Sequence, residues 1–189
     1  MNPEQKLQPT PAQTVGPFYG YALPFDRDNQ LLAPGLPGTI RLHGTVYDGA
    51  GEPIPDVLLE IWQADSAGNI SREAGSLVRD GYTFTGWGRT AVDGAGNYTF
   101  TTVNPGAVEE GAAPFISLLI LGRGLTHKLH TRIYLPEDEE ALAGDQLLSS
   151  LPRERRNSLI AARETDGGLR FDVYLQGENE TVFLSFPGA

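Results

Sequence analysis

Apolar and polar residues alternate with a period of two in a series of short segments. In residues 39–48, Ile40, Leu42 and Val46 fall on one face, which is typical of a half-buried strand. Turn residues, mainly Gly, Asp and Asn, separate this segment from similar ones. We expect strands at residues 39–48, 57–64, 86–92, 97–103, 115–121, 128–135, 169–175 and 181–186. About eight strands at such spacings predict an all-β fold, a two-sheet antiparallel β-sandwich.

Two connections and one strand carry further information. The segments that flank residues 93–96 and residues 177–179 are expected to pair as hairpins, because both connections are short and contain glycine. Residues 115–121 are apolar on both faces apart from Ser117, as expected of a central strand that is covered on both sides.

Helix signals occur only late in the chain, between the last strands. Pro136 favours a short helix over residues 137–141, whose acidic side chains suit a helix N-terminus. Pro152 favours another over residues 153–162. These helices are expected to decorate the sandwich.

The first 38 residues have no sustained period and are predicted to form an extended N-terminal arm. They are rich in Pro and Gly but contain the aromatic residues Phe18, Tyr19, Tyr21 and Phe25. Because exposed aromatic surface is costly in water, the arm is expected to pack on its own body or on a neighbouring chain. The expected organisation is an arm over residues 1–38 and a β-sandwich over residues 39–189.

Composition excludes several classes of protein. The 189-residue chain has a net charge of −10 and no basic tract, which argues against nucleic-acid binding. It contains no cysteine, so disulfides, zinc–thiolate sites, iron–sulfur clusters and cysteine nucleophiles are excluded. Its first residues are polar, and no apolar run approaches the ~18 residues of a membrane span. We therefore expect a cytoplasmic protein with no membrane partner.

The few histidines do not form an obvious metal site. His127 and His130 are three apart on a predicted strand, so their side chains point to opposite faces. A better candidate is the polar face of residues 128–135, where His130, Arg132 and Tyr134 lie together. An arginine there can present a fork of donors to a carboxylate. The alternative is a solvated strand face on which Arg132 stacks on Tyr134.

Several motifs together resemble one family. The most specific are Trp62-Gln63-Ala64-Asp65 and His130-Thr131-Arg132. The likeness extends over residues 10–18, 44–48, 59–69, 84–90, 103–106, 130–135 and 171–177, nearly from end to end. In these motifs the chain resembles the intradiol aromatic-ring dioxygenases. The resemblance implies a β-sandwich and a non-haem ferric iron held by two tyrosines and two histidines.

The resemblance also implies that this chain has lost the iron ligands. Phe115 and Ser117 stand at the positions of the two histidines, Val108 at that of one tyrosine, and Ser76 near that of the other. Phenylalanine and valine offer no lone pair, and serine is a poor ferric ligand. The resemblance therefore implies no metal in this chain. It implies an α/β hetero-oligomer in which this chain is the α subunit and a homologous β chain binds Fe(3+).

The activity implied by the resemblance is intradiol cleavage of 3,4-dihydroxybenzoate with O₂ to 3-carboxy-cis,cis-muconate. This chain would shape the substrate pocket, would hold no catalytic residue alone, and would not be active alone. The arm would pack on the partner chain. By motif match, the substrate-binding residues are Thr14, Gly16 and Pro17 in the arm and Arg132 on its strand.

Two other hypotheses remain open. A metal-free carrier or structural sandwich, binding an aromatic acid or a partner protein, would use the same features, because a fold does not settle a function. A self-sufficient enzyme with an unrecognised site would have only three histidines and no cysteine as soft ligands, which disfavours it.

Overall fold

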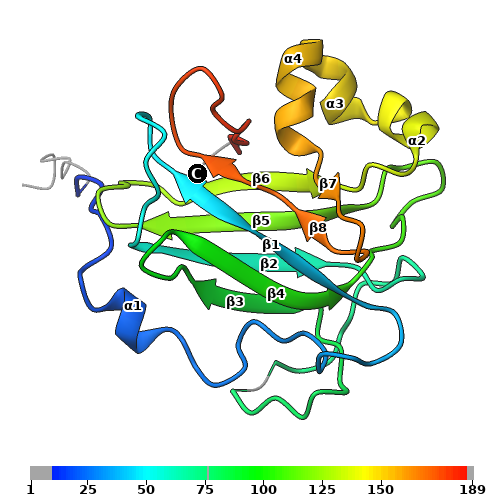
Figure 1. Ribbon diagram of the computed structural model, residues 1–189, viewed down its shortest axis with the longest axis horizontal. Coiled ribbons are helices and arrows are strands. Elements are labelled where there is room, and N and C mark those ends of the chain that lie inside the picture. Colours follow the sequence, from blue (N-terminus) through cyan, green and yellow to red (C-terminus); the bar gives the residue numbers. More distant parts are fainter. Residues whose placement is uncertain (1–9, 76, 187–189) are drawn as a thin grey trace, which may run out of the picture.

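The computed structural model describes residues 10–75 and 77–186, which form two β-sheets packed face to face (Figure 1). The first sheet contains β1 (Thr39–Tyr47), β4 (Asn97–Val103), β7 (Ala162–Arg163), β8 (Leu169–Arg170) and β9 (Val173–Tyr174). The second contains β2 (Val57–Gln63), β3 (Trp87–Ala91), β5 (Phe115–Gly122) and β6 (Leu129–Tyr134). The strand orders are β4-β1-β8-β7, with β9 also on β1, and β3-β2-β5-β6. The predicted two-sheet β-sandwich is confirmed.

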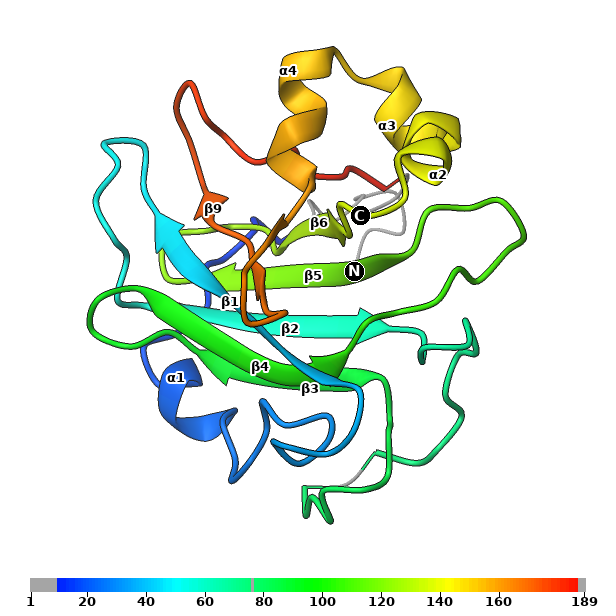
Figure 2. The same ribbon diagram turned by 45° about the vertical axis from the view of Figure 1, so that its right-hand side comes forward.

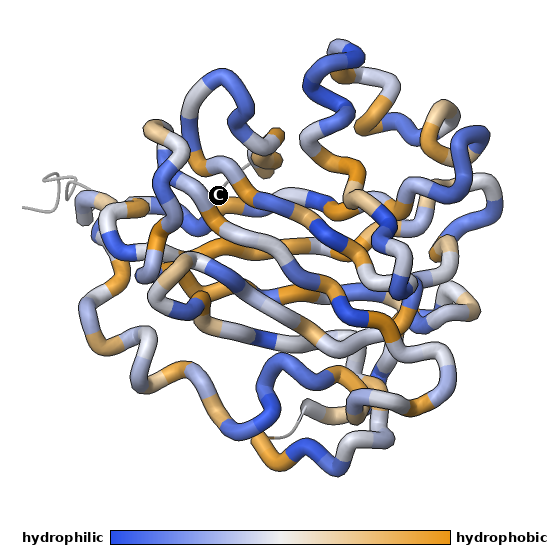
Figure 3. Tube along the Cα trace, in the orientation of Figure 1, coloured by the Kyte–Doolittle hydropathy of each residue, from blue (hydrophilic) through white to orange (hydrophobic). Residues whose placement is uncertain are grey.

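The sheets bury alternate residues of their strands between them, as the sequence pattern predicts. In β5, Ile116, Leu118 and Ile120 are fully buried and share one cluster with Leu42 of β1 and Phe100 of β4. β5 lies between β2 and β6 and is antiparallel to both, which confirms its central position. Figure 3 shows apolar residues recurring along β2 and β5. The other side chains of β5 are only half-buried, so its outer face is partly open.

The turn after β3 joins the two sheets. β3 pairs with β2, whereas β4 pairs with β1, so the hairpin predicted between them is wrong. Within the turn, the Asp93 carboxylate accepts bonds from the N–H groups of Ala95 and Asn97, both at 2.9 Å. Asp48 and Asp65 form the same arrangement in their own turns. This local chemistry specifies a tight reversal, while the burial of apolar faces decides which strands pair.

The hairpin predicted at the end of the chain is reduced to the contact of Tyr174 with Thr181 across its turn. Residues 169–175 are divided between β8 and β9, both of which run parallel to β1. Between them, the Phe171 carbonyl accepts a bond from the Tyr98 hydroxyl at 2.5 Å, inside the core. Residues 181–186 form an isolated bridge with β6 and one backbone bond to β9, from the Thr181 N–H to the Tyr174 carbonyl at 3.0 Å. Between β8 and β9 the Thr45 N–H of β1 donates to the Asp172 carboxylate at 3.0 Å, so a side chain replaces a backbone acceptor where the segment is divided.

Short helices cover one end of the sandwich beside β6 (Figure 2). They are α2 (Glu139–Gly144), α3 (Gln146–Ser150), α4 (Arg153–Arg156) and the 3-10 helix η1 (Asn157–Leu159). The helix predicted at residues 137–141 begins later, because Asp138 is its N-cap. The helix predicted at residues 153–162 ends early, and Ala161 instead donates to the Tyr134 carbonyl at 3.0 Å. No helix in the described part of the chain is long and apolar enough to cross a membrane.

The later part of the arm is attached to its own sandwich. A one-turn helix, α1 (Tyr19–Ala22), buries Tyr19, whose hydroxyl donates to the Asp56 carbonyl at 2.7 Å. Further along, Phe25 stacks on Trp87 with 6.2 Å between ring centroids, and Leu31 enters the core. These contacts hold the arm against the edge of the second sheet.

Gly44→Ala tests the close approach of β1 to the segment between β8 and β9. A Cβ at Gly44 would lie 1.9 Å from the carbonyl oxygen of Phe171, which belongs to the backbone and cannot rotate away. We expect the free energy of unfolding, measured in urea, to fall by about 2 kcal/mol or more. Gly94→Ala is the control, because a Cβ there meets no atom within 4 Å. Equal stabilities for the two variants would contradict this prediction.

Candidate functional site

A pocket of about 580 Å³ opens where β5 begins and β6 ends. Val108, Phe115 and Arg132, three positions singled out from the sequence, all line it. Its other apolar walls include Ile70, Ala113, Pro114 and Leu147, and its acidic residues are Glu109, Glu110 and Asp145. The volume lies within the range of small-molecule sites.

The Arg132 guanidinium is held from two sides at the wall of this pocket. Its Cζ lies 4.0 Å from the centroid of the Phe115 ring, in a cation–π contact. Its Nη1 donates to the Tyr134 hydroxyl at 3.1 Å. That hydroxyl donates to Asp145 Oδ1 at 3.0 Å, and the same oxygen accepts a bond from the Leu148 N–H at 3.0 Å. This series of contacts fixes the orientation of Arg132.

Tyr134 is fully buried, although the strand pattern predicts it on a polar face with His130 and Arg132. Side chains from α3, η1 and the C-terminal segment pack around it in a second apolar cluster. Burial raises the pKa of Tyr134 to about 12, against the opposing effect of Arg132. At neutral pH its hydroxyl therefore keeps the proton that it donates to Asp145. The alternative of a solvated strand face is wrong for Tyr134, because strand periodicity does not reveal which helices cover a face.

The arm residues lie at the other end of β5. Thr14 Oγ1 accepts a bond from the Gly124 N–H at 2.7 Å, in the turn between β5 and β6. The same hydroxyl donates a hydrogen bond to the Gly122 carbonyl oxygen at 3.5 Å. Gly16 and Pro17 follow and are exposed. The start of the arm is thus anchored to this turn.

Arg132 and the arm are therefore well separated. Ser117 pairs with Arg132 across β5 and β6, while Thr14 contacts Gly122 at the far end of β5. The five residue steps from Ser117 to Gly122 span about 16 Å of extended strand. The four predicted substrate-binding residues lie at two places, with Arg132 beside Phe115 and the other three at the turn.

Sequence reasoning missed a cation that lies beside the arm. Arg123 follows Gly122 in the turn, its side chain is 61% exposed, and its Nε lies 3.0 Å from Asp56 Oδ2. Asp56 Oδ1 also accepts a bond from the Tyr19 hydroxyl at 2.9 Å. Burial and, to a lesser extent, Asp56 raise the pKa of Tyr19. The sequence did contain a signal for this cation. Arg123 lies between Gly122 and Gly124, and flanking glycines indicate an exposed turn.

Comparison with known proteins places the chain in a family. A family model described as dioxygenase matches residues 14–177. The chain is 40% identical to the protocatechuate 3,4-dioxygenase alpha chain of Pseudomonas putida, over 97% of this chain and 100% of that one. The chain belongs to the intradiol dioxygenase family. It is also 36% identical to the corresponding alpha chain of Burkholderia cepacia, over 94% of this chain and 98% of that one.

Further relatives extend this assignment to other intradiol dioxygenases. The beta chain of Burkholderia cepacia protocatechuate 3,4-dioxygenase is 31% identical, over 75% of this chain and 66% of that one. Among solved structures, the dioxygenase domain of a carbohydrate-binding fusion protein from Streptomyces sp. SirexAA-E has a TM-score of 0.59 and 26% identity, over 90% and 99% of the two chains. Hydroxyquinol 1,2-dioxygenase from Pseudomonas putida DLL-E4, at 16% identity over 90% of this chain and 68% of that one, shares the fold with a TM-score of 0.56.

Intradiol dioxygenases depend on a non-haem iron, and the pocket of this chain does not suit one. Phe115 and Ser117 are two apart on the outer face of β5, and Val108 lines the pocket with Phe115. Two of these side chains offer no lone pair, and a serine hydroxyl is a weak ligand for ferric iron. Ser76, the fourth predicted position, lies outside the described residues. At the three described positions the donor set therefore does not fit ferric iron.

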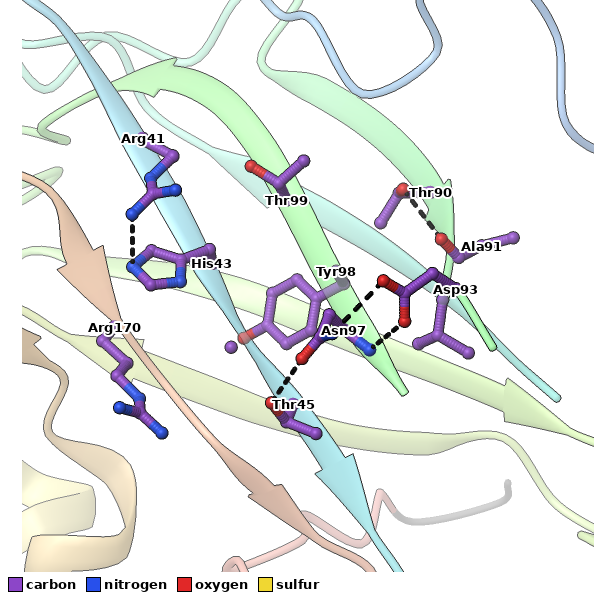
Figure 4. A pocket seen from close by; sticks show the side chains of 12 residues that line it. Arg41, His43, Thr45, Thr90, Ala91, Asp93, Asn97, Tyr98, Thr99 and Arg170 are labelled. Carbon is purple, nitrogen blue, oxygen red and sulfur yellow. Dashed lines mark hydrogen bonds between the residues drawn. The ribbon is translucent and has the colours of Figure 1, made fainter. Parts of the chain in front are cut away.

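A second pocket, of about 620 Å³, lies on the outer face of the first sheet (Figure 4). Arg41, His43 and Arg170 line part of it. His43 Nε2 lies 2.7 Å from Glu164 Oε2, and Arg170 Nη2 lies 2.9 Å from Asp172 Oδ2. The hydrogen bond from His43 lowers the pKa of Glu164. Because Glu164 and Asp172 already pair with these side chains, this surface is a weaker candidate for an anionic ligand than the pocket of Arg132.

Tyr134→Phe tests the buried hydroxyl of the first pocket through the pH dependence of stability. The pKa of Tyr134 is raised from 10.0 to about 12 in the folded chain. Between these pH values the unfolded chain loses the proton and the folded chain keeps it, so stability falls as pH rises. We expect a shallower fall between pH 10 and 12 in Tyr134→Phe, measured by urea unfolding at several pH values.

Tyr82→Phe is the matched control, because Tyr82 is 74% exposed. Its pH dependence should follow that of the original chain. Parallel curves for Tyr134→Phe and the original chain would contradict the assignment of a raised pKa to Tyr134.

Proposed function

We propose that this chain is the alpha subunit of an intradiol dioxygenase that cleaves 3,4-dihydroxybenzoate with O₂ to 3-carboxy-cis,cis-muconate. In this proposal a homologous beta chain holds the ferric iron, and the two chains form an α/β hetero-oligomer. The observation that carries the proposal is a pocket lined by Phe115 and Val108, two residues that the resemblance assigns to ligand positions of the family. The nearly complete coverage of two alpha-chain relatives supports the same role.

Exposed aromatic side chains support the presence of a partner chain. Phe18, Tyr21 and Trp62 are 75%, 86% and 50% exposed. Aromatic residues are enriched at protein interfaces, where their apolar surface is removed from water. Residues 10–18 are mostly exposed too. They belong to the arm, residues 1–38, and the arm is proposed to pack on the beta chain.

Thr14, Gly16 and Pro17 are proposed to border the substrate at the interface with the beta chain. The Thr14 hydroxyl accepts a hydrogen bond from the Gly124 N–H. This bond fixes the position of Thr14 relative to the sheet, and Gly16 and Pro17 follow in the chain. Beside them, the exposed Arg123 supplies a positive charge in a chain of net charge −10. This local charge would attract a substrate carboxylate that the chain as a whole repels. These residues hold and orient the substrate, and bond-making is left to the partner chain.

Arg132 is also proposed to bind a carboxylate, through its fork of N–H donors. About 16 Å of strand separates it from the arm, which is more than a single-ring acid spans. The carboxylate bound by Arg132 is therefore proposed to lie in the pocket of Arg132 itself.

A metal-free carrier or structural sandwich is the second candidate function. The pocket with apolar walls and one arginine favours it, since binding an aromatic acid there needs no iron. The two candidates differ in one consequence. As a carrier, this chain would be dispensable for the activity of the beta chain.

Iron content and oxygen uptake with 3,4-dihydroxybenzoate test the subunit proposal. Each chain is produced alone, and the two are produced together. We expect iron and rapid oxygen uptake in the purified complex and neither in this chain alone, because Phe115 and Val108 offer iron no ligand. Full activity of the beta chain alone would favour the carrier. Stoichiometric ferric iron in this chain alone would contradict the proposal.

Arg123→Met in the complex tests the charge beside the arm. We expect KM for 3,4-dihydroxybenzoate to rise about tenfold, equivalent to about 1.4 kcal/mol, because the attraction to the carboxylate is lost. Catechol, which has no carboxylate, should be affected less. The exposed Arg153 of α4 provides a control for the loss of one positive charge. An equal rise for both substrates would mean that Arg123 supports the arm without binding substrate.

A further inference from the structure

The exposed Arg123 beside the arm already has an acid of its own chain as a partner. This acid is Asp56, and its other carboxylate oxygen accepts a bond from Tyr19. We propose that Asp56 is a positioning residue that competes with the carboxylate of the ligand for Arg123, while Tyr19 holds Asp56 within reach. The inference deepens the proposed function and rests on the part of it that assigns Arg123 to the substrate carboxylate.

The ion pair of Arg123 and Asp56 has the properties of an exchangeable contact. Arg123 Nε lies 3.0 Å from Asp56 Oδ2, and the two side chains are 61% and 38% exposed. The pair of Arg89 and Glu60 is different, because both side chains are largely buried and Glu60 Oε1 accepts bonds from Nε and Nη2 of Arg89 at 2.8 and 2.6 Å. Exposed pairs are weak, since water competes for both partners and salt screens the charges. Arg123 can therefore exchange Asp56 for another carboxylate.

Tyr19 keeps Asp56 hydrogen-bonded when Arg123 leaves it. The Tyr19 hydroxyl lies 2.9 Å from Asp56 Oδ1 and 2.7 Å from the Asp56 carbonyl oxygen, whereas Arg123 contacts the other carboxylate oxygen. Burial raises the pKa of Tyr19, so the hydroxyl retains the proton that it donates. An acid that keeps one hydrogen bond loses less free energy on releasing a cation than an acid left without a partner. Tyr19 thus lowers the cost of the exchange and keeps Asp56 close to Arg123.

The backbone of Arg123 is fixed even though its side chain can change partners. The Thr14 hydroxyl accepts a bond from the Gly124 N–H at 2.7 Å and donates to the Gly122 carbonyl at 3.5 Å, so the arm holds both neighbours of Arg123. The Leu125 N–H closes the turn by donating to the same Gly122 carbonyl at 3.2 Å. The guanidinium can therefore move between Asp56 and a ligand beside the arm by rotation of its own side chain.

Competition by Asp56 limits how tightly this site holds anions. In the proposed reaction the ring opens between the hydroxyl-bearing carbons, which become carboxylates, so the product carries more negative charge than the substrate. An Arg123 without an acid beside it would bind both more tightly, and the product most of all. Asp56 offers the cation another partner inside the chain, which weakens substrate binding slightly and favours release of the product.

Equilibrium dialysis with 4-hydroxybenzoate tests the proposal in the assembly in which the chain purifies. This probe has the carboxylate but only one hydroxyl group, so it is bound without being cleaved. We expect Asp56→Asn to bind it about two- to fivefold more tightly, the range expected of an exposed ion pair, and to bind phenol unchanged. Glu140→Gln removes an exposed acid on α2, which follows β6 whereas the turn of Arg123 precedes it, and should bind like the original chain.

The double variant Asp56→Asn/Arg123→Met separates competition from simple repulsion. It should bind 4-hydroxybenzoate as weakly as Arg123→Met, because Asp56 acts through Arg123. Tighter binding by the double variant than by Arg123→Met would overturn the inference, since Asp56 would then repel the ligand directly. Unchanged or weaker binding by Asp56→Asn, with weakened binding by Arg123→Met, would overturn it as well. Binding unaffected by Arg123→Met would overturn the assignment of Arg123 itself and this inference with it.

Oxygen uptake by the complex with the beta chain gives a second readout. In Asp56→Asn we expect the KM for 3,4-dihydroxybenzoate to fall and inhibition by the product to strengthen, whereas a merely damaged site would raise KM. Tyr19→Phe should have the opposite effect and bind 4-hydroxybenzoate more weakly, because Asp56 without its second partner holds Arg123 more firmly. If Asp56→Asn fails to fold, unchanged binding by Tyr19→Phe overturns the proposal. Dialysis requires no turnover, so failure of the subunit proposal is distinguishable from failure of this one.

Discussion

The alternation of side chains along β5 is the constraint on which the rest of the structure depends. One face of the strand, with Ile116, Leu118 and Ile120, closes the core between the sheets. The other face begins at Phe115, in the pocket, and continues through Ser117. Because successive residues point to opposite faces, substitutions on the outer face leave the packing of the inner face unchanged. The residues at these two outer positions can therefore change while the fold is kept.

The residue at the start of β5 also affects the stability of the pocket. A histidine at the Phe115 position without a metal would bring a polar ring beside the Arg132 guanidinium, and its unpaired nitrogen would cost free energy if buried. The phenylalanine ring instead offers its negative face to the cation at 4.0 Å. A phenylalanine at this position thus avoids that cost and adds a favourable contact. Arg132 is the cation of a pocket that combines apolar side chains with the acidic residues Glu109, Glu110 and Asp145.

The local pattern predicted most of the strands but not all of their partners. The period of two located β1 to β6 within one or two residues, because each buries one face. The turn at Asp93 and the segment around Phe171 were misjudged, since short-range signals do not say which sheet a strand joins. For the site, motif likeness pointed to Val108, Phe115 and Arg132, which do share one pocket. The separation of Arg132 from the arm follows from strand register, which no single segment contains.

The two arginines at the ends of this strand pair differ in ways that suit different tasks. Arg123 is 61% exposed and pairs with Asp56 at the surface, where ion pairs contribute at most about 1 kcal/mol and solvent screens the charge. Such a cation can release its acid at little cost and attract an approaching anion. Arg132 is half-buried and fixed by an aromatic ring and a protonated tyrosine, neither of which neutralises it. Among the contacts of Arg132 within the described residues, an acid is reached through the Tyr134 hydroxyl, which donates to Asp145.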